Sequence, residues 1–332
     1  MNLLITGGYG FIGWQFLNLA AKDPNINIIN VDKLTYAATN APEDVYDYYN
    51  RCSEQWYGTF VRADIADKEM MESIIKKYNV DAIVNFAAET HVDNSIKDNS
   101  KFVHTNINGT MSLLESCRSI WGSNSQNKFV QVSTDEVYGH LEPNAPAFDE
   151  GTNYNPRNPY SATKAAADHL VEAYCNTYKL NGVITHCSNN YGPGQHTEKL
   201  IPKTITQALK LMPIPVYGDG LQVRDWIYVV DHARGIMRTL QGNTNPGEHF
   251  CIGASNEICN IDLVRSICHH LDAIKPLAHG SYADLILFVE DRKGHDRRYA
   301  INSSKMMQRF NWKPQCDFRG GISRTIDYYI NK

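Results

Sequence analysis

Two adjacent carboxylates, Asp135 and Glu136, stand directly after a short apolar run at 128–132, with Thr134 in front of them. A run of this length is typical of a buried strand, and ligands of open parallel sheets bind where such strands end. Two carboxyl groups held side by side in a closed site push their pKa values apart, which suits one acid and one base. The sequence therefore predicts acid–base chemistry at this strand end.

A second pair, Tyr160 and Lys164, is spaced by one helical turn and shares one face of a predicted helix. A free tyrosine has a pKa of about 10 and is hardly ionised at neutral pH. It can act as a base only if a cation such as Lys164 stabilises its phenolate. The candidate catalytic residues are Thr134, Asp135, Glu136, Tyr160 and Lys164.

Three glycines, Gly7, Gly10 and Gly13, stand between a predicted strand at 2–6 and a predicted helix that runs to Ala21. Glycine allows a tight turn and a close backbone approach to a pyrophosphate. The helix N-terminus adds unpaired N–H groups and the positive end of the helix dipole. This arrangement predicts a dinucleotide site.

Asp32 ends the next predicted strand, at 27–31, about 20 residues beyond the last glycine. A carboxylate there hydrogen-bonds the adenosine ribose and repels a 2′-phosphate, so the pattern favours NAD over NADP. Asp64 and Ile65 are candidate adenine contacts. The run 86–90 follows a strand, and its small alanines let a cofactor lie against the backbone.

The elements that must position these residues alternate between strands and helices, which implies parallel β/α units. The fold class predicted is α/β, a Rossmann-type doubly wound parallel sheet with a smaller C-terminal substrate-binding lobe. Residues 1–190 are the expected NAD-binding domain with the catalytic residues, and 191–332 mainly the substrate lobe, with some segments returning to the first domain. Beyond those named, strands are expected at 81–86 and 183–187, and helices at 67–78 and over much of 99–120.

Bulk properties narrow the class of protein. Hydrophobic residues make up 42% and charged residues 20% of the 332, and the formal net charge is -4. These values favour a folded core and argue against a nucleic-acid surface or a polybasic membrane patch. No apolar run approaches the ~20 residues of a membrane span, and the first residues enter a strand pattern, so we expect neither a membrane span nor a signal peptide. The eight cysteines, Cys52 among them, form no Cys-x-x-Cys pair, so we expect no metal site and a cytoplasmic setting.

Taken together, these residues resemble the extended short-chain dehydrogenase/reductase family, and within it the dTDP-glucose 4,6-dehydratases, over nearly the whole chain. The glycines and the Tyr-x-x-x-Lys spacing mark the superfamily, whereas Thr-Asp-Glu before Val-Tyr-Gly is typical of dehydratases. The segments that carry the resemblance are 6–13, 32–37, 87–93, 133–139, 160–164, 188–193, 198–202, 215–220, 224–226 and 291–296.

The resemblance implies site residues, a nucleotide-sugar substrate and a homodimer. The implied cofactor contacts are Gly7, Gly10, Phe11, Ile12, Gly13, Asp32, Lys33, Leu34, Thr35, Asp64, Ile65, Phe86, Ala87, Ala88, Glu89, Thr105, Tyr160, Lys164 and Asn190. The implied substrate contacts are Thr90, Thr134, Asn189, Lys199, Leu200, Pro215, Tyr217, Arg224, Asn260, Arg292 and His295. Among these, the two arginines suit a diphosphate, because a guanidinium fork matches its oxygens.

The implied reaction converts an NDP-glucose to its 4-keto-6-deoxy form, as in the synthesis of sugars such as rhamnose. Tyr160 would take the O4 proton, with Thr134 on the same oxygen, while NAD oxidises C4. Glu136 would remove the C5 proton and Asp135 would protonate the departing C6 hydroxyl. The hydride would then return to C6, so the cofactor would stay bound through turnover.

Several positions depart from the family pattern. Asn94 and His186 stand where Arg is usual, His196-Thr197 replaces Phe-Pro, and Trp14 occupies a position that is usually small. None of them belongs to the proposed catalytic set, but they bear on substrate fit around 194–198.

Three alternatives stay open. A nucleotide-sugar 4-epimerase needs the tyrosine, lysine and hydroxyl but not the acidic pair, and a UDP-glucuronate decarboxylase typically keeps a glutamate without the aspartate. Asp135 argues against both. A catalytically silent NAD-sensing protein would be free to lose the catalytic residues, yet all are present. The nucleotide, thymidine or uridine, is not decided by the sequence.

Overall fold

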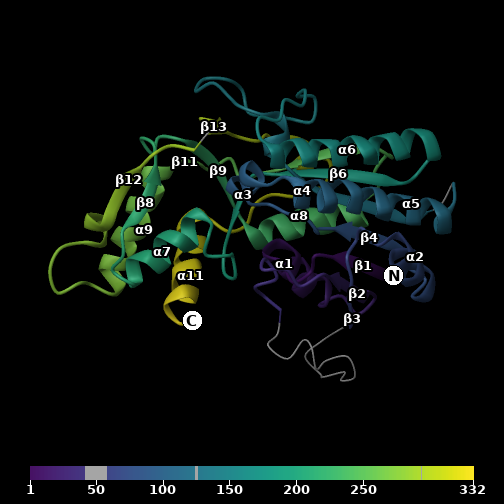
Figure 1. Ribbon diagram of the computed structural model, residues 1–332, viewed down its shortest axis with the longest axis horizontal. Coiled ribbons are helices and arrows are strands. Elements are labelled where there is room, and N and C mark those ends of the chain that lie inside the picture. Colours follow the sequence, from purple (N-terminus) through teal and green to yellow (C-terminus); the bar gives the residue numbers. More distant parts are fainter. Residues whose placement is uncertain (42–57, 124–125, 293) are drawn as a thin grey trace.

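The computed structural model describes residues 1–41, 58–123, 126–292 and 294–332, and its larger part is built on one parallel sheet (Figure 1). The strand order is β10-β6-β5-β4-β1-β2-β3, and every neighbouring pair is parallel. Its strands are β1 (Asn2–Thr6), β2 (Asn27–Asp32), β3 (Gly58–Arg62), β4 (Ala82–Asn85), β5 (Lys128–Thr134), β6 (Gly182–Cys187) and β10 (Glu248–Ile252). The direction of winding reverses between β1 and β4, where a crevice for a dinucleotide is expected.

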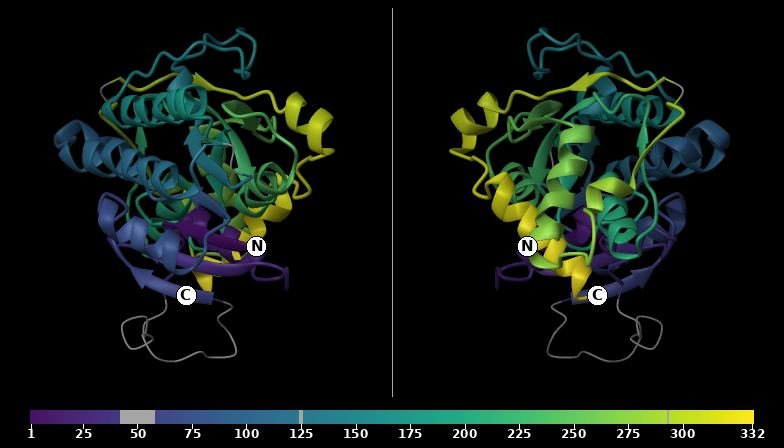
Figure 2. Two further views of the ribbon diagram at one scale, coloured as in Figure 1. Left: turned by 90° about the vertical axis from the view of Figure 1, so that its right-hand side faces the viewer. Right: turned by 90° about the vertical axis from the view of Figure 1, so that its left-hand side faces the viewer.

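Helices cover both faces of this sheet (Figure 2). Successive side chains of a strand point to opposite faces. Leu3 and Ile5 of β1 accordingly pack with α1 (Phe11–Ala20), α8 (Val229–Gln241) and α10 (Ser304–Phe310), whereas Leu4 packs on the other face. That other face is covered by α2 (Lys68–Lys77), α5 (Thr110–Trp121) and α6 (Pro159–Tyr178).

The predicted fold class is confirmed, and so are the strands expected from 2–6, 27–31, 81–86, 128–132 and 183–187. Two strands of the sheet were not predicted. β3 begins at a glycine and is mostly exposed, and β10 comes from the C-terminal half of the chain, where it pairs with β6. The division of the chain at residue 190 stays a prediction.

The single helix expected over much of 99–120 is wrong in detail. The structure has a short α4 (Ser100–Phe102), a π-helical segment at Val103–Gly109, and then α5. π-helical turns often occur at functional sites. Here the wider turn carries Asn106, whose amide reaches the backbone of Glu89 after β4.

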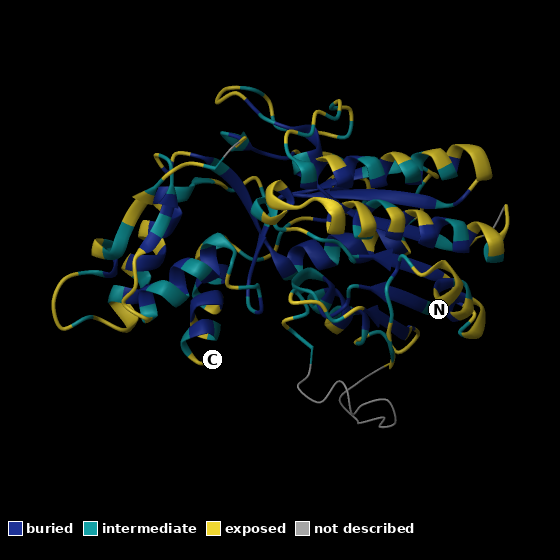
Figure 3. Cartoon of the chain, viewed as in Figure 1, coloured by how far each residue is buried: buried dark blue, intermediate teal, exposed yellow. Residues whose placement is uncertain are grey.

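The smaller part lies beyond the carboxyl ends of the large sheet (Figure 1). Its central strand β9 (Val223–Tyr228) pairs with β7 (Asn189–Tyr191), β11 (Glu257–Cys259) and β13 (Arg298–Tyr299), and a two-stranded sheet joins β8 (Ile214–Tyr217) to β12 (Ile286–Val289). The helices α7 (Leu200–Leu209), α9 (Asn260–Ile274) and α11 (Phe318–Ile330) enclose a separate apolar core. Buried residues form the centres of both parts, and exposed residues follow the outer helices and loops (Figure 3).

Short helical segments complete the described chain: α3 (Val92–Lys97), η3 (Asp135–Tyr138) and η4 (Tyr282–Leu285). Within the described ranges, none of these or the longer helices combines the length and apolarity of a membrane span. Seven cysteines in the described part carry free thiols, and Cys52 lies outside it.

Candidate active site

The acidic pair lies where β5 ends and the chain turns into η3. Thr134 caps this turn, because its hydroxyl accepts a hydrogen bond of 3.3 Å from the Glu136 N–H. Thr134 and Asp135 are buried, and Glu136 opens toward the smaller part of the molecule. The strand end therefore presents a hydroxyl and two carboxyl groups to one cavity.

The beginning of α6 fixes the other two candidate catalytic side chains. Asn158 accepts a hydrogen bond from the Ser161 N–H, the Ser161 hydroxyl accepts one from the Asn158 N–H, and Pro159 supplies a preset first turn. Tyr160 and Lys164 follow on the face toward β5, where the lysine Nζ donates to the Val132 carbonyl at 2.7 Å. These cap residues explain why the helix begins at the cavity.

The environment of the two carboxyl groups differs. Burial, together with the neighbouring charges of Glu136 and Asp225, raises the pKa of Asp135 well above its usual range. Burial also raises the pKa of Glu136, but Lys199, Arg224 and Arg292 oppose this. Asp135 is thus the better candidate for a neutral acid and Glu136 for an ionised base.

Burial shifts the pKa values of Tyr160 and Lys164 in opposite directions. Burial and the nearby Glu136 charge raise the pKa of Tyr160 well above its usual range, and a hydrogen bond with Thr134 opposes the shift. Burial lowers the pKa of Lys164, which the Asp168 carboxylate opposes. A phenolate at Tyr160 therefore requires positive charge beside it, from Lys164 and from a bound cationic cofactor ring.

The glycine turn before α1 fits a pyrophosphate. Gly7 has a φ of +70°, and a Cβ there would lie 2.7 Å from the Ala87 backbone nitrogen. A Cβ at Gly13 would lie 2.3 Å from the Gly7 carbonyl oxygen. No side chain caps the N-terminus of α1 at Gly10, so its first N–H groups are offered to a ligand.

Asp32 at the end of β2 fits the ribose of a dinucleotide. Its two carboxylate oxygens accept hydrogen bonds from the backbone N–H groups of Tyr9 and Leu34, at 3.0 and 2.8 Å. These bonds hold the carboxylate at the cavity wall and leave lone pairs for ribose hydroxyls. The residues present therefore fit a bound NAD.

The structure brings the predicted cofactor contacts together around two adjoining cavities. Leu34 is the exception among them, because it contributes a backbone N–H to Asp32 rather than a cavity wall. Asp64 lines the larger cavity, of about 570 Å³, but its carboxylate is bonded to Lys33 at 2.6 Å and to His104 at 3.0 Å. The Lys33 and His104 contacts lower the Asp64 pKa to about 2 against the opposing effect of burial, so it stays ionised.

Asn106 is a residue that the sequence reasoning missed. Its Oδ1 accepts from the Glu89 N–H at 2.9 Å, and its Nδ2 donates to the Glu89 carbonyl and to the Thr163 hydroxyl. It therefore ties the loop after β4 to the catalytic helix α6. The π-helical segment that carries it has no signature in the sequence.

Substituting Asp32 by alanine should weaken NAD binding about tenfold or more, because the ribose would lose a charged hydrogen-bond acceptor. NADP binding should weaken less or improve, because the repulsion of the 2′-phosphate would be gone. Titration of both cofactors with the purified variant measures this change in preference. An unchanged ratio of the two dissociation constants would contradict the assignment of Asp32.

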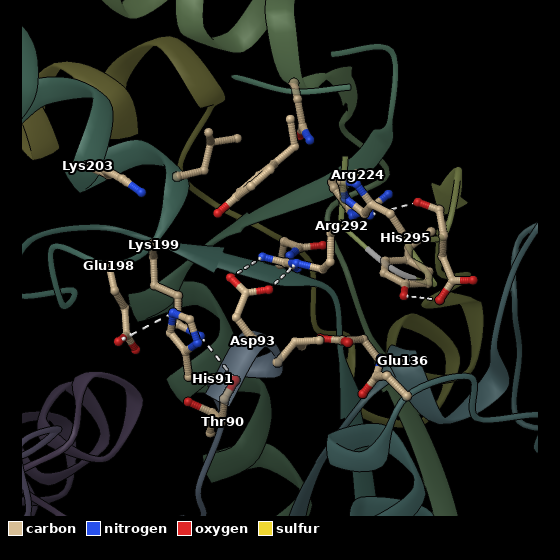
Figure 4. Close-up of a pocket in the computed structure, with 18 of the residues that line it drawn as sticks. Thr90, His91, Asp93, Glu136, Glu198, Lys199, Lys203, Arg224, Arg292 and His295 are labelled. Atoms are coloured by element: carbon tan, nitrogen blue, oxygen red, sulfur yellow. Dashed lines mark hydrogen bonds and ion pairs between the residues drawn. The ribbon is translucent and has the colours of Figure 1, made fainter. Parts of the chain in front are cut away.

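A third cavity, of about 340 Å³, opens between the strand ends of the large sheet and the smaller part (Figure 4). The predicted substrate contacts gather there, and Thr134 lines the adjoining catalytic cavity. Those that line the third cavity are Thr90, Asn189, Lys199, Leu200, Pro215, Tyr217, Arg224, Asn260, Arg292 and His295. Further residues line this cavity that the predicted substrate contacts did not include, among them His91, Asp93, Glu198 and Lys203.

Arginines and orphaned amides make this cavity suited to an anionic, polar ligand. Arg224 is held by the carbonyls of Val223 and Asp296 at 2.8 and 2.9 Å, and Arg292 forms a two-point ion pair with Asp93 (Figure 4). The side-chain oxygens of Asn189 and Asn260, which line this cavity, are buried without a hydrogen-bond partner. Such groups are normally paired in a protein, so a ligand with hydroxyl or N–H donors fits there.

Some of the residues that depart from the family pattern line these cavities, and others lie away from them. Asn94 lines the substrate cavity and His196 the catalytic cavity, where its ring meets the Tyr36 ring edge-on. His186 is fully buried behind the site, and Trp14 packs near Tyr9 at the start of α1.

Neighbouring cavities share some of the residues that line them. Gly7, Gly10 and Ala88 line both cofactor-side cavities, and Glu136 and Lys199 line both the catalytic and the substrate cavity. One site can thus hold a dinucleotide and a second ligand against the same catalytic groups.

Comparison with known proteins agrees with this geometry. A family model described as GDP-mannose 4,6 dehydratase matches residues 4–325. A curated protein from Sinorhizobium fredii, a probable dTDP-glucose 4,6-dehydratase, is 44% identical over 339 residues, which cover 99% of this chain and 93% of that protein. The chain belongs to the dTDP-glucose 4,6-dehydratase family.

The chain also superposes on solved structures of a dTDP-glucose 4,6-dehydratase and of an enzyme with a different activity. The dTDP-glucose 4,6-dehydratase of Bacillus anthracis in complex with NAD superposes with a TM-score of 0.85 at 40% identity, covering 100% of this chain and 97% of that one. A UDP-glucuronic acid 4-epimerase from Bacillus cereus, in complex with UDP-glucuronic acid and NAD, reaches a TM-score of 0.86 at 26% identity, covering 100% and 99%. The fold is shared by both, so residues rather than architecture separate dehydratases from epimerases.

Proposed function

We propose that this protein is an NAD-dependent dehydratase that converts an NDP-glucose, dTDP-glucose or UDP-glucose, to the NDP-4-keto-6-deoxyglucose. The observation that carries this proposal is the acidic pair after β5. Asp135 is buried with one carboxylate oxygen unpartnered, whereas Glu136 faces three cationic side chains in the adjoining cavity. One neutral acid and one ionised base are what elimination of water across C5 and C6 requires.

In this proposal Tyr160 removes the proton from the sugar O4, and Thr134 holds the same oxygen by a hydrogen bond. When bound, NAD supplies the hydride acceptor for C4 and returns the hydride to C6. Lys164, anchored on the Val132 carbonyl, stabilises the Tyr160 phenolate by its charge.

The 4-ketone makes the C5 proton acidic, so Glu136 removes it. Glu136 then returns a proton to C5 when the hydride is added to C6. Asp135, kept neutral by burial, protonates the C6 hydroxyl as it leaves as water. Because Asp135 and Tyr160 are buried, the charge interactions among these groups are stronger than they would be in bulk water.

Asp135 also favours a dehydratase over the alternatives. A 4-epimerase needs only to oxidise and reduce C4, and a UDP-glucuronate decarboxylase loses carbon dioxide rather than a hydroxyl. Neither reaction expels a hydroxyl, so neither needs a neutral acid to protonate a leaving group. A non-catalytic NAD-sensing protein would have no use for the cavity that joins both carboxyl groups to the cofactor walls.

The proposal is tested by mixing the purified protein, without added NAD, separately with dTDP-glucose and with UDP-glucose. We expect a product lighter by one water, formed by NAD retained from expression, and the faster reaction identifies the nucleotide. A product of unchanged mass with inverted configuration at C4 would instead show that the protein is a 4-epimerase.

Arg292 is expected to bind the diphosphate after exchanging its pairing with Asp93. Arg292→Ala should raise KM about tenfold to a hundredfold with a smaller change in kcat, because a charge-assisted bond to the remote part of the substrate is lost. Arg309→Ala, which removes a surface arginine, is the control. Steady-state kinetics of both variants test this prediction. An unchanged KM in Arg292→Ala would contradict the assignment of Arg292 to the diphosphate.

We also propose that the protein forms a homodimer and acts in the cytoplasm. We propose further that its product is used in the synthesis of deoxysugars, for example rhamnose. The exposed apolar side chains Val103, Met111 and Tyr178, on or beside α5 and α6, support a contact between copies through these helices. The free thiols of the seven described cysteines support a reducing compartment. Light scattering of the purified protein tests the dimer, and a monomeric mass would exclude it.

A further inference from the structure

A buried polar cluster lies behind the catalytic side chains, and the mechanism above does not use it. Its centre is Asp168 on α6, which has 0% exposed surface. The Oδ2 atom of Asp168 accepts hydrogen bonds from the Ser133 hydroxyl at 2.5 Å and from the Tyr154 hydroxyl at 3.2 Å. The same oxygen lies 3.5 Å from Nε2 of His186.

Asp168 and Lys164 share one face of α6, because one helical turn separates them. Both are anchored to the last residues of β5. Lys164 donates to the Val132 carbonyl, and Ser133, the next residue, donates to Asp168. Thr134 follows directly, so the cluster is built on the strand end that carries the catalytic hydroxyl.

The Lys164 ammonium needs a counter-charge. Only 4% of the residue is exposed, and the one hydrogen bond described for its Nζ is to a neutral carbonyl. A buried charge is costly unless an opposite charge accompanies it. Among the groups near Lys164, the Asp168 carboxylate favours its protonated form most.

The remaining neighbours of Asp168 leave its charge available to Lys164. His186 is fully buried on β6, its Nδ1 lies 3.0 Å from the Tyr138 hydroxyl and its Nε2 lies 2.7 Å from the Tyr154 hydroxyl. Burial lowers the pKa of His186, so its imidazole is neutral at physiological pH.

Further titratable groups close the cluster from β10 and from the next turn of α6. The ring of His249 stacks on His186 with centroids 5.2 Å apart and bonds Glu172 at 2.8 Å. The Cys251 thiol lies 3.7 Å from the Tyr138 hydroxyl. The His249 contact keeps the Glu172 charge paired, and burial raises the Cys251 pKa well above its usual range, so this thiol stays neutral.

We propose that Asp168 is a positioning residue of the reaction, whose buried carboxylate is the counter-charge that keeps Lys164 protonated beside Tyr160. Ser133 and Tyr154 hold the carboxylate, and the neutral His186 leaves its charge uncompensated. The inference rests on the proposed function, in which Lys164 acts as a cation on the Tyr160 phenolate.

The titration of Lys164 tests this role directly. Lysine labelled with 13C at Cε is followed by NMR in the NAD-loaded protein, and Lys164→Met identifies the resonance. Asp168→Asn should lower the pH at which Lys164 titrates by about one unit or more, because the ammonium loses its counter-charge. The alkaline limb of the kcat/KM profile should move to lower pH by the same amount.

Asp231→Asn is the matched control. Asp231 on α8 is another buried carboxylate, and it accepts hydrogen bonds from the backbone N–H groups of Gln315 and Cys316. Its loss should leave the Lys164 titration in place. An Asp168→Asn protein in which Lys164 titrates as in the unchanged chain, or an equal shift in Asp231→Asn, would overturn the proposal.

Asp168→Ser, which is also neutral but smaller, gives a second variant if Asp168→Asn does not fold. Lys164 should titrate at lower pH in this variant too, because the same counter-charge is lost. An unshifted Lys164 titration in Asp168→Ser would also overturn the proposal. If the unchanged protein dehydrates no nucleotide sugar, the proposed function fails, whereas the Lys164 titration still decides the role of Asp168.

Discussion

Replacing Tyr160 with phenylalanine should lower kcat about a thousandfold while NAD stays bound. A positioned general base contributes about a hundredfold to ten-thousandfold, and the proposed first step has no other base at O4. The ring itself is retained, so the packing of Tyr160 against Phe102 persists. Steady-state rates and the NAD released on denaturation are measured on the same preparation.

Tyr174→Phe is the control for this prediction. Tyr174 stands on the same helix, but its hydroxyl bonds Glu115 away from the cavities. It should retain nearly all of the activity. A Tyr160→Phe rate within tenfold of the unchanged protein would remove Tyr160 from its role as base.

Replacing Asp135 with asparagine should slow water loss by about a hundredfold or more, because an amide cannot give a proton to the leaving hydroxyl. Cofactor binding should be unchanged. Glu136 remains in place, so the C5 hydrogen of the substrate should still exchange with solvent deuterium. The two rates are followed together by mass spectrometry in heavy water.

Glu136→Gln separates the two carboxyl groups. It should lose both the exchange at C5 and the elimination, because the base itself is removed. If Asp135→Asn loses exchange as completely as Glu136→Gln, or if its elimination is as fast as in the unchanged protein, the division into acid and base is wrong.

The sheet and its cofactor end were predictable because they follow from local signals. The strand at 2–6, the glycines, the helix and Asp32 occur in one uninterrupted stretch, and the apolar runs mark most other strands. The structure places the glycines and Asp32 around one pair of cavities. The cap formed by Asn158 and Ser161 is a local signal of the same kind that the sequence analysis did not use, and it explains where α6 begins.

Long-range pairings were not predictable from local signals. β10 joins the sheet from beyond residue 240 because β6 offers it an open edge, a fact that exists only in the folded chain. The π-helical turn at Asn106 and the Arg292–Asp93 ion pair depend on residues distant in sequence. The same holds for the cluster around Asp168, which joins residues from α6, β5, β6 and β10.

The most direct test of the central claim follows one hydrogen atom. The purified protein is given dTDP-glucose, and separately UDP-glucose, carrying deuterium at C4, and the product is examined by NMR and mass spectrometry. The account predicts loss of one water with the deuterium retained and found at C6, because one bound NAD both oxidises C4 and reduces C6. Deuterium found again at C4 of an epimerised sugar, or no loss of water from either substrate, would contradict it.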